Sequence, residues 1–286
     1  MILIADSGST KCDWIPVDKT GAQVLEKITT KGLNPAILDR DTLKQRIFES
    51  PALADCKDAV TLLYFYGAGC GTATPKQMLK EVLLDVFKAA HIEVEEDTMA
   101  AVRATINTPF EAAVVCILGT GSNCSYYNGK TLFQNVESLG YSVMDDASGN
   151  YFGRALIRGY YFNHMPENIK AAFESQYNLD ADYLKYQLYK QPNPNAFLAG
   201  FAEFLVLNKT SEYMQGLIND GLRLFFENLV MQYKKELEDV PLHFVGSIAF
   251  YIQDDIKAMA KEFGFKTGNF ERRPIDGLVK FHTSQL

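Results

Sequence analysis

The chain has 286 residues, of which 47 % are hydrophobic and 22 % charged, as in packed globular proteins. At about 150 residues per domain, this length predicts roughly two domains. The 35 acidic and 28 basic residues give a net charge of −7, which disfavours a general nucleic-acid binder because such proteins need a basic surface. No apolar run approaches the ~20 residues of a membrane-spanning helix. The amino-terminal residues lack a signal-peptide pattern, so we expect a cytoplasmic protein with no membrane partner.

The cysteines do not have the spacing of a disulfide framework, a zinc site or an iron–sulfur cluster. Their number is odd, and no two form a Cys-x-x-Cys pair. We expect most of them to be reduced, buried, small apolar side chains: Cys12, Cys56, Cys70, Cys116 and Cys124.

The first half is predicted to open with a β-meander. Three short runs separated by turns form it, at residues 1–5, 12–17 and 22–28. Thr74 is expected to cap a helix that has Pro75 in its first turn. Further elements are expected as strands at 60–66 and 92–95, and as helices at 41–49 and 97–105.

The second half is predicted to repeat the opening pattern. A strand, a glycine turn and a β-hairpin are expected again, with strands at 112–118, 124–127 and 130–134. Another strand is expected at 242–245, and helices at 149–163, in parts of 165–205, at 212–238 and at 248–263. The repetition predicts two related α/β halves, each built on a mixed sheet. Ligands in such proteins bind between the halves, near strand ends.

Two turns of small residues are candidates for phosphate binding. Asp6-Ser-Gly-Ser-Thr-Lys11 and Gly119-Thr-Gly-Ser-Asn123 each lie between predicted strands. Such turns present backbone N–H groups and hydroxyls to phosphate oxygens. Asp6 at a strand end is a candidate Mg²⁺ ligand, directly or through water. The alternative is a pair of ordinary hairpins, with Gly and Asp serving the turn.

Three further segments follow predicted strands, and each has an alternative explanation. The glycine loop 66–71 lacks the spacing of a dinucleotide fingerprint and suits close backbone approach to a ligand. Asp97 is either a helix cap or a general base. Asp145 and Asp146 are caps or contacts to Mg²⁺ or a hydroxyl, and Gly246-Ser247 is a cap or a nucleotide contact.

The motifs resemble those of the actin-like superfamily of sugar kinases and chaperone ATPases. Asp6–Asp13 is similar to the first phosphate motif, Leu118–Asn123 to the second, and Val245–Ala249 to the adenosine motif, in the family's order. The resemblance covers nearly the whole chain. It is strongest to the N-acetylglucosamine kinase family, which shares a sequence group with the activator ATPases of benzoyl-CoA reductase and hydroxyacyl-CoA dehydratase. Those activators hold an iron–sulfur cluster through cysteines, a pattern that this chain lacks.

The resemblance implies an α/β fold of two duplicated actin-like (ribonuclease H-like) domains with an interdomain cleft. The expected domains are residues 1–108, rejoined by 271–286, and residues 109–270. The implied activity is ATP- and Mg²⁺-dependent phosphorylation of an amino sugar, with N-acetylglucosamine as the first candidate. A regulatory or activator-type ATPase and a sugar-binding sensor that has lost transfer are the alternatives. A homodimer is left open.

The resemblance also implies site residues. Asp97 is implied as the catalytic base and Asp6 as the metal ligand. The implied nucleotide-binding residues are Ser7, Gly8, Ser9, Thr10, Lys11, Gly119, Thr120, Gly121, Gly246 and Ser247. The implied sugar-binding residues are Asn34, Gly121, Ser122, Asn123 and Asp145.

Overall fold

The computed structural model describes residues 1–8 and 11–285 of the chain. These residues form two compact units. Unit 1 comprises Met1–Glu111 and Arg273–Leu286, and unit 2 comprises Ala112–Arg272. Within residues 1–8 and 11–285, every helix is too short or too polar to span a bilayer.

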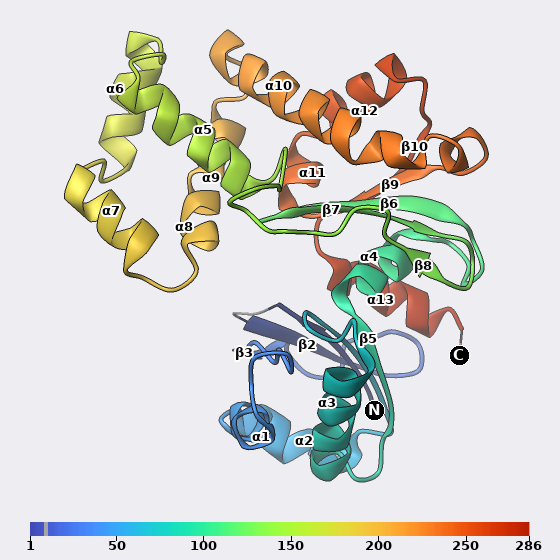
Figure 1. The fold of residues 1–286 in the computed structure, drawn as a ribbon. Coiled ribbons are helices and arrows are strands. Elements are labelled where there is room, and N and C mark those ends of the chain that lie inside the picture. Colours follow the sequence, from blue (N-terminus) through green and yellow to red (C-terminus); the bar gives the residue numbers. More distant parts are fainter. Residues whose placement is uncertain (9–10, 286) are drawn as a thin grey trace. The chain divides into compact units, whose positions relative to one another are not determined.

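Unit 1 is built on a five-stranded mixed sheet with the order β3-β2-β1-β4-β5 (Figure 1). β1 pairs antiparallel with β2 and parallel with β4, and β4 pairs parallel with β5. The carboxyl ends of β1, β4 and β5 therefore meet at one edge of the sheet. The strands are β1 Ile2–Ser7, β2 Lys11–Val17, β3 Ile28–Lys31, β4 Leu62–Gly67 and β5 His91–Glu96.

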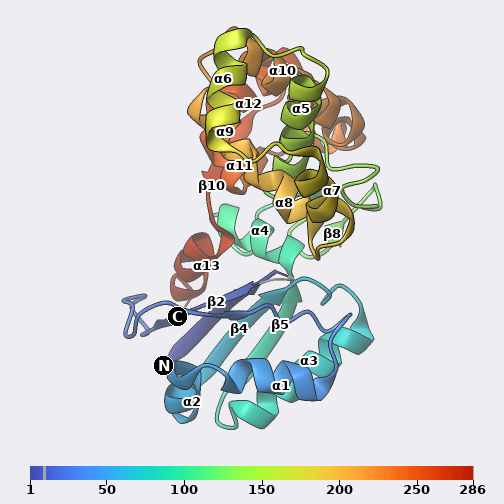
Figure 2. The same ribbon diagram turned by 90° about the vertical axis from the view of Figure 1, so that its left-hand side faces the viewer.

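Helices cover both faces of this sheet (Figure 2). Leu3 and Phe65 belong to the core on one face, with α1 Arg40–Phe48, α2 Pro51–Cys56 and α3 Ala73–Val86 on that side. The 3₁₀ turn Lys57–Ala59 follows α2. On the opposite face, Ile4 and Tyr66 belong to a second core with residues of α4 Asp97–Thr105 and α13 Pro274–Thr283. Alternating side chains along the strands explain why neighbouring residues join different cores.

Unit 2 has a second five-stranded mixed sheet, ordered β10-β9-β6-β7-β8. β6 pairs antiparallel with β7 and parallel with β9. Read from β8, the order is β8-β7-β6-β9-β10, which is the topology of unit 1 repeated. The strands are β6 Ala113–Leu118, β7 Ser122–Tyr127, β8 Leu132–Phe133, β9 Leu242–Val245 and β10 Thr267–Glu271. This repetition confirms the predicted α/β fold of two duplicated mixed sheets.

The helices of unit 2 share one large apolar core with its sheet. Phe152, Phe204 and Phe226 are among the side chains buried in it. The helices α5 to α9 extend to one side of the sheet, and α10 and α12 pack over it (Figure 1). The helices of the unit are α5 Gly149–Tyr161, α6 Glu167–Gln176, α7 Ala181–Tyr189, α8 Pro194–Gly200, α9 Ala202–Leu207, α10 Glu212–Asn228, α11 Ser247–Tyr251 and α12 Gln253–Glu262.

Several predicted boundaries were wrong. The third strand is Ile28–Lys31, not 22–28, because its pairing with β2 starts only at Ile28 opposite Trp14. The Thr74 cap was also wrong, since α3 begins at Ala73 after Thr72. β10 was not expected, because its sequence Thr-Gly-Asn-Phe-Glu lacks the apolar alternation of a strand.

Two long predicted helices are broken. The segment 212–238 is α10 followed by the 3₁₀ turns Val230–Tyr233 and Glu236–Glu238. Tyr233 turns inward there, and its hydroxyl donates to the backbone carbonyl of Cys124 at 3.0 Å. The segment 248–263 divides at Ile252 into α11 and α12. Hydrophobic periodicity continued across both breaks and did not reveal them.

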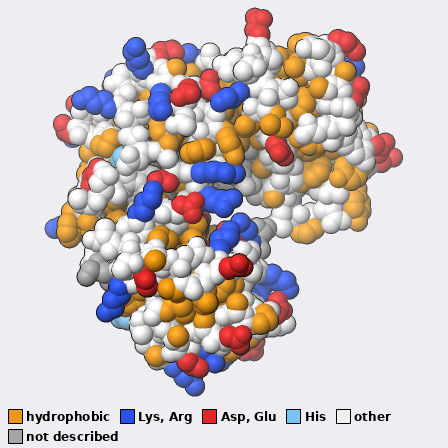
Figure 3. Space-filling model, turned by 180° about the vertical axis from the view of Figure 1, so that it is seen from behind, with side chains coloured by type: hydrophobic (Ala, Val, Ile, Leu, Met, Phe, Trp, Pro, Cys, Tyr) orange, Lys and Arg blue, Asp and Glu red, His pale blue; other side chains and the backbone are white. Residues whose placement is uncertain are grey.

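All five cysteines are free and buried, as expected from their spacing. Figure 3 shows acidic and basic side chains interspersed over one side of the surface, consistent with the mixed charge of the sequence.

Candidate functional site

The first group of predicted site residues lies at the carboxyl edge of the unit 1 sheet. Asp6, Tyr66 and Glu95 are paired across β1, β4 and β5, so their side chains point to the same face. Asp97 follows β5 directly and is the first residue of α4, which packs on that face. The parallel strands thus carry Asp6 and Asp97 to one edge, with Gly67 at the end of the strand between them.

The two carboxylates interact electrostatically. Burial is the main cause that raises the pKa of Asp6 to about 7, followed by the charges of Asp97 and Asp13, while Lys11 opposes the shift. The Asp97 side chain is solvent-accessible, yet surrounding protein atoms reduce its hydration and raise its pKa, and the charge of Glu96 adds to this. Asp97 Oδ1 accepts a hydrogen bond from the Thr98 amide at 3.0 Å. Glu96, not Asp97, occupies the helix cap position.

The loop that carries Asn34 is fastened to the same edge. Ser7 is buried, and its hydroxyl oxygen accepts from the Leu33 amide at 2.8 Å. Asn34 Oδ1 accepts from the Ala36 amide at 2.9 Å. Gly69 has φ +82°, and a Cβ added there would lie 2.0 Å from Asn34 Oδ1. The backbone of the glycine loop thus approaches the Asn34 side chain closely, and its expected approach to a ligand stays a prediction.

The basic residue of the first motif contacts a carboxylate. Lys11 Nζ lies 2.9 Å from Asp13 Oδ2, and its side chain is 62 % exposed. Lys27 Nζ lies 3.4 Å from the same Asp13 Oδ2, and the Thr29 hydroxyl donates a hydrogen bond to Asp13 Oδ1 at 2.9 Å. Gly8 is exposed after the end of β1. Ser9 and Thr10 lie outside the described residues.

The second group lies in unit 2, where two glycine motifs come together. Gly119 N donates to Gly121 O at 3.0 Å, which closes the turn between β6 and β7. Gly246 follows β9 with φ +119°, and a Cβ added there would lie 2.3 Å from Leu118 O. The structure therefore places Gly246 directly against the start of the Gly119 turn. Ser247 is exposed and begins α11.

The Asp145 carboxylate is hydrogen-bonded to residues at this turn. Its backbone is left-handed, with φ 68°. Its Oδ1 accepts from the Ser122 amide at 3.2 Å, and its Oδ2 accepts from Asn150 Nδ2 at 2.9 Å. Asn150 Nδ2 also donates to Thr120 O at 2.6 Å. The cap of α5 is Ser148, so the cap interpretation of Asp145 was wrong.

Several polar atoms near this turn have no protein partner. They are Ser122 Oγ, Asn123 Oδ1 and Asn150 Oδ1, each buried and without a hydrogen bond in the described part of the chain. Buried polar groups normally have partners, so these atoms suit hydrogen bonding to water or a ligand. Sequence reasoning missed Asn150, because its contacts depend on the backbone path of Asp145.

A pocket of about 410 Å³ adjoins the Gly246 motif within unit 2. Residues of α8, α9 and α11 line it, and the guanidinium of Arg272 lies 5.1 Å from the centre of the Tyr251 ring. No motif in the sequence indicated the contact between Arg272 and Tyr251. The lining residues are Ala199, Gly200, Ala202, Glu203, Val206, Leu207, Ser247, Ile248, Tyr251 and Arg272.

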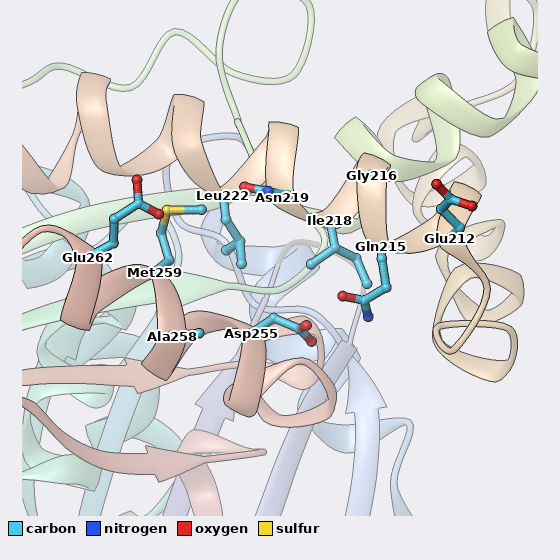
Figure 4. Close-up of a pocket in the computed structure, with 10 residues that line it drawn as sticks. All are labelled: Glu212, Gln215, Gly216, Ile218, Asn219, Leu222, Asp255, Ala258, Met259 and Glu262. Atoms are coloured by element: carbon cyan, nitrogen blue, oxygen red, sulfur yellow. The ribbon is translucent and has the colours of Figure 1, made fainter.

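A second groove of unit 2 contains none of the predicted site residues. It has about 410 Å³ between α10 and α12, with Ile218, Leu222 and Met259 on its apolar part and Glu212 and Asp255 among its polar residues (Figure 4). Within residues 1–8 and 11–285, no group of three or more His, Cys, Asp or Glu side chains is arranged to hold a metal ion.

Comparison with solved structures identifies the family. The chain is 34 % identical to a protein from Porphyromonas gingivalis named "Putative N-acetylglucosamine Kinase", and the match covers 99 % of both chains with a TM-score of 0.91. The chain belongs to the N-acetylglucosamine kinase family. This result confirms the resemblance seen in the motifs, and it makes the duplicated fold an actin-like one. No family model and no curated protein sequence matches the chain.

More distant structures share the fold of this kinase family. A protein from Chromobacterium violaceum, also named "Putative N-acetylglucosamine Kinase", is 12 % identical over 98 % of both chains, with a TM-score of 0.69. A ROK family glucokinase from Streptomyces griseus, solved with glucose and AMPPNP, is 15 % identical with a TM-score of 0.55. That match covers 98 % of this chain and 97 % of the glucokinase. At these identities the likeness concerns the fold alone.

Proposed function

We propose that this protein transfers the terminal phosphate of ATP to a hydroxyl of an amino sugar, with N-acetylglucosamine as the first candidate. The observation that carries the proposal is the placement of Asp97 and Asp6 at one edge of the unit 1 sheet, in a chain of this kinase family. The two units correspond in this proposal to the expected domains 1–108 with 271–286, and 109–270.

Asp97 is the proposed general base. A base with a raised pKa accepts a proton more readily, and the pKa of Asp97 is raised by burial and by Glu96. Its place in the first turn of α4 and the hydrogen bond from the Thr98 amide keep the ionised form available. In the proposed step Asp97 takes the proton of the sugar hydroxyl. The hydroxyl oxygen then bonds to the γ-phosphorus, and the bond to the leaving oxygen of ADP breaks.

The residues around Asp6 fit a divalent cation. Asp6 is largely enclosed, two other carboxylates raise its pKa, and Lys11 is the cation that opposes them. A hard cation takes carboxylate and phosphate oxygens as ligands, so Mg²⁺ brought with ATP would offset this excess of negative charge. When bound, Mg²⁺ would neutralise charge on the transferring phosphate. Asp6 itself would orient the cation, directly or through water.

Unit 2 supplies the proposed nucleotide site. The Gly119–Gly121 turn presents small residues, and Gly246 allows the next motif to lie against it. The adjoining pocket has the Tyr251 ring, the Arg272 guanidinium and apolar side chains of α9, which suit an aromatic base. Ser7, Gly8 and Lys11 are proposed to contact phosphates from unit 1, and Ser9 and Thr10 stay predictions outside the described residues.

The proposed sugar contacts come from fixed polar groups. Asn34 is held by the Ala36 amide and by the close approach of Gly69. Ser122 and Asn123 have buried polar atoms without a protein partner, and Asp145 is held beside them by the Ser122 amide and Asn150. Such fixed groups favour catalysis by positioning rather than by new covalent chemistry.

The test is an ADP-release assay across amino sugars, with product mass measured for each. We expect ADP only when a sugar acceptor and Mg²⁺ are both present, and a product heavier than the sugar by one phosphate. ADP release without any sugar would instead favour the regulatory ATPase. Sugar binding without turnover would favour the sensor.

A further inference from the structure

A buried polar cluster links three elements of unit 1 below the proposed catalytic edge. The Tyr66 hydroxyl on β4 lies 2.7 Å from Arg103 Nη1 of α4 and 2.7 Å from His282 Nε2 of α13. Tyr66 is 1 % and His282 5 % exposed. The Tyr64 ring stacks on the His282 ring, with centroids 3.6 Å apart. None of these residues belongs to the phosphate, adenosine or sugar motifs.

A guanidinium only donates, so the Tyr66 oxygen accepts from Arg103. The direction of the hydrogen bond between Tyr66 and His282 depends on the tautomer of the ring. In the tautomer with its proton on Nδ1, Nε2 accepts the Tyr66 proton. Burial and the charge of Arg103 lower the pKa of His282 to about 3, so the ring is neutral at physiological pH. The hydrogen bond between Tyr66 and His282 therefore involves a neutral ring over the working pH range.

This cluster contacts the carboxyl-terminal part of α4, the helix that begins with Asp97, through Arg103. Arg103 lies six residues after Asp97, about 9 Å along a rigid helix. Arg103 Nη2 also lies 3.8 Å from Glu95 Oε1 on β5. The other carboxylate oxygen of Glu95, Oε2, lies 2.6 Å from Lys76 Nζ. Beside it, α13 approaches α4 closely, since a Cβ added to Gly277 would lie 2.4 Å from Ala104 O. A rotation of α4 about its axis would break these contacts.

We propose that Tyr66 is a positioning residue whose hydroxyl, held between Arg103 and His282, fixes α4 and thereby Asp97 over the carboxyl edge of the sheet. Apolar packing between α4, α13 and the strands would be met equally by a Phe ring. A buried polar network with satisfied partners specifies one arrangement of the elements it joins. This inference rests on the proposed function of Asp97.

The experiment compares Tyr66→Phe with Tyr64→Phe. Both remove one hydroxyl from neighbouring same-face tyrosines of β4, but the Tyr64 hydroxyl makes no hydrogen bond within the described part of the chain. We expect Tyr66→Phe to lower kcat about tenfold or more while KM for ATP and sugar stays within twofold. We also expect faster hydrogen exchange at the amides of residues 98–101. Tyr64→Phe should match the parent in both measurements.

Variants of His282 provide the rescue. His282→Gln keeps an acceptor for the Tyr66 proton and should retain more kcat than His282→Leu, at comparable melting temperatures. Unchanged exchange at residues 98–101 in Tyr66→Phe would overturn the inference, as would equal kcat for Tyr66→Phe and Tyr64→Phe. If the parent shows no sugar-dependent ADP release, the proposed function fails, and hydrogen exchange alone then decides whether Tyr66 fixes α4.

Discussion

Asp6 and Asp97 lie at the carboxyl ends of two strands that flank β4, and the charge of Asp97 is one cause of the raised pKa of Asp6. Such mutual repulsion is costly for a folded protein without a ligand. It is explained if the edge is built to receive a cation and a proton during phosphoryl transfer. Perturbed carboxylates of this kind are typical of functional sites.

Replacing Asp97 by Asn tests the base. Asn keeps the size of the side chain and leaves the cap residue Glu96 in place, so folding should be nearly unchanged. Loss of a general base typically lowers the rate by about 10²–10⁴, and we expect kcat to fall by that order while ATP and sugar still bind. The control is Glu96→Gln, which removes the adjacent carboxylate and should keep kcat within about tenfold of the parent. If Asp97→Asn keeps the turnover of the parent, Asp97 is not the general base, and Asp145 or Asp146 becomes the candidate.

Replacing Asp6 by Asn should separate stability from activity. The folded pKa of Asp6, about 7, lies above its ordinary value of 3.8. The protonated form is therefore favoured by folding, and this contribution is complete below pH ~4 and lost as pH rises through about 7. Asp6→Asn cannot ionise, so without Mg²⁺ at pH 8 its free energy of unfolding should exceed that of the parent by up to about 4 kcal/mol, and its melting temperature should be higher. The difference should shrink toward pH 4.

Asp6→Asn should also need more Mg²⁺ for half-maximal turnover, because it removes an anionic ligand.

Asp13→Asn is the control for stability, because its effect on the free energy of unfolding should have the opposite sign. Burial acts to raise the pKa of Asp13, but hydrogen bonds from Lys11 and Thr29 and the charges of Lys11 and Lys27 hold it below its ordinary value. Asp13→Asn should therefore destabilise the protein at pH 8. An unchanged Mg²⁺ dependence, or a lower melting temperature, in Asp6→Asn would contradict the assignment.

Local patterns in the sequence were sufficient for much of the fold. The start of α4 at Asp97 was predictable because a short strand with alternating apolar residues ends just before it, and the two glycine turns marked the duplication. β10 was not predictable from its own sequence, because the glycine at position 268 is required by a contact with a distant residue. A Cβ added there would lie 2.3 Å from the His243 ring. Pairing between distant strands leaves no periodic signal.

The candidate site was predictable in part for the same reason. Sequence motifs singled out Asp6, Asp97 and Gly246 as site residues. The roles of these residues stay predictions. Asn150 was missed because its contacts depend on the left-handed backbone of Asp145. The contact between Tyr66 and His282 joins residues 216 positions apart, so no local pattern could have shown it.

Replacing Gly246 by Ala tests the contact between the two glycine motifs. Its φ of +119° is unfavourable for any residue with a Cβ, and the added carbon would meet Leu118 O at 2.3 Å. We expect a loss of about 1–3 kcal/mol in stability or more, with weaker ATP binding in the fraction that stays folded. Gly216→Ala is the control, because open space surrounds that position in α10 and Ala favours helix by about 0.5–1 kcal/mol. Equal melting temperatures for the two variants, measured by calorimetry, would contradict this contact.

Filling the pocket beside Ser247 tests the proposed nucleotide site without touching either glycine motif. Gly200 is the last residue of α8 and lines the pocket, and a Cβ added there meets nothing within 4 Å. Gly200→Leu should therefore fold normally while its side chain occupies space needed by the base of ATP. We expect KM for ATP to rise about tenfold, which corresponds to about 1.4 kcal/mol of lost binding, while KM for the sugar is unchanged.

Gly216→Leu makes the same substitution in the groove between α10 and α12, where Gly216 is also unobstructed, and should leave both KM values at the parental level. If Gly200→Leu binds ATP as the parent does, the base lies elsewhere. If Gly216→Leu raises KM for ATP instead, the groove of Figure 4 becomes the nucleotide site.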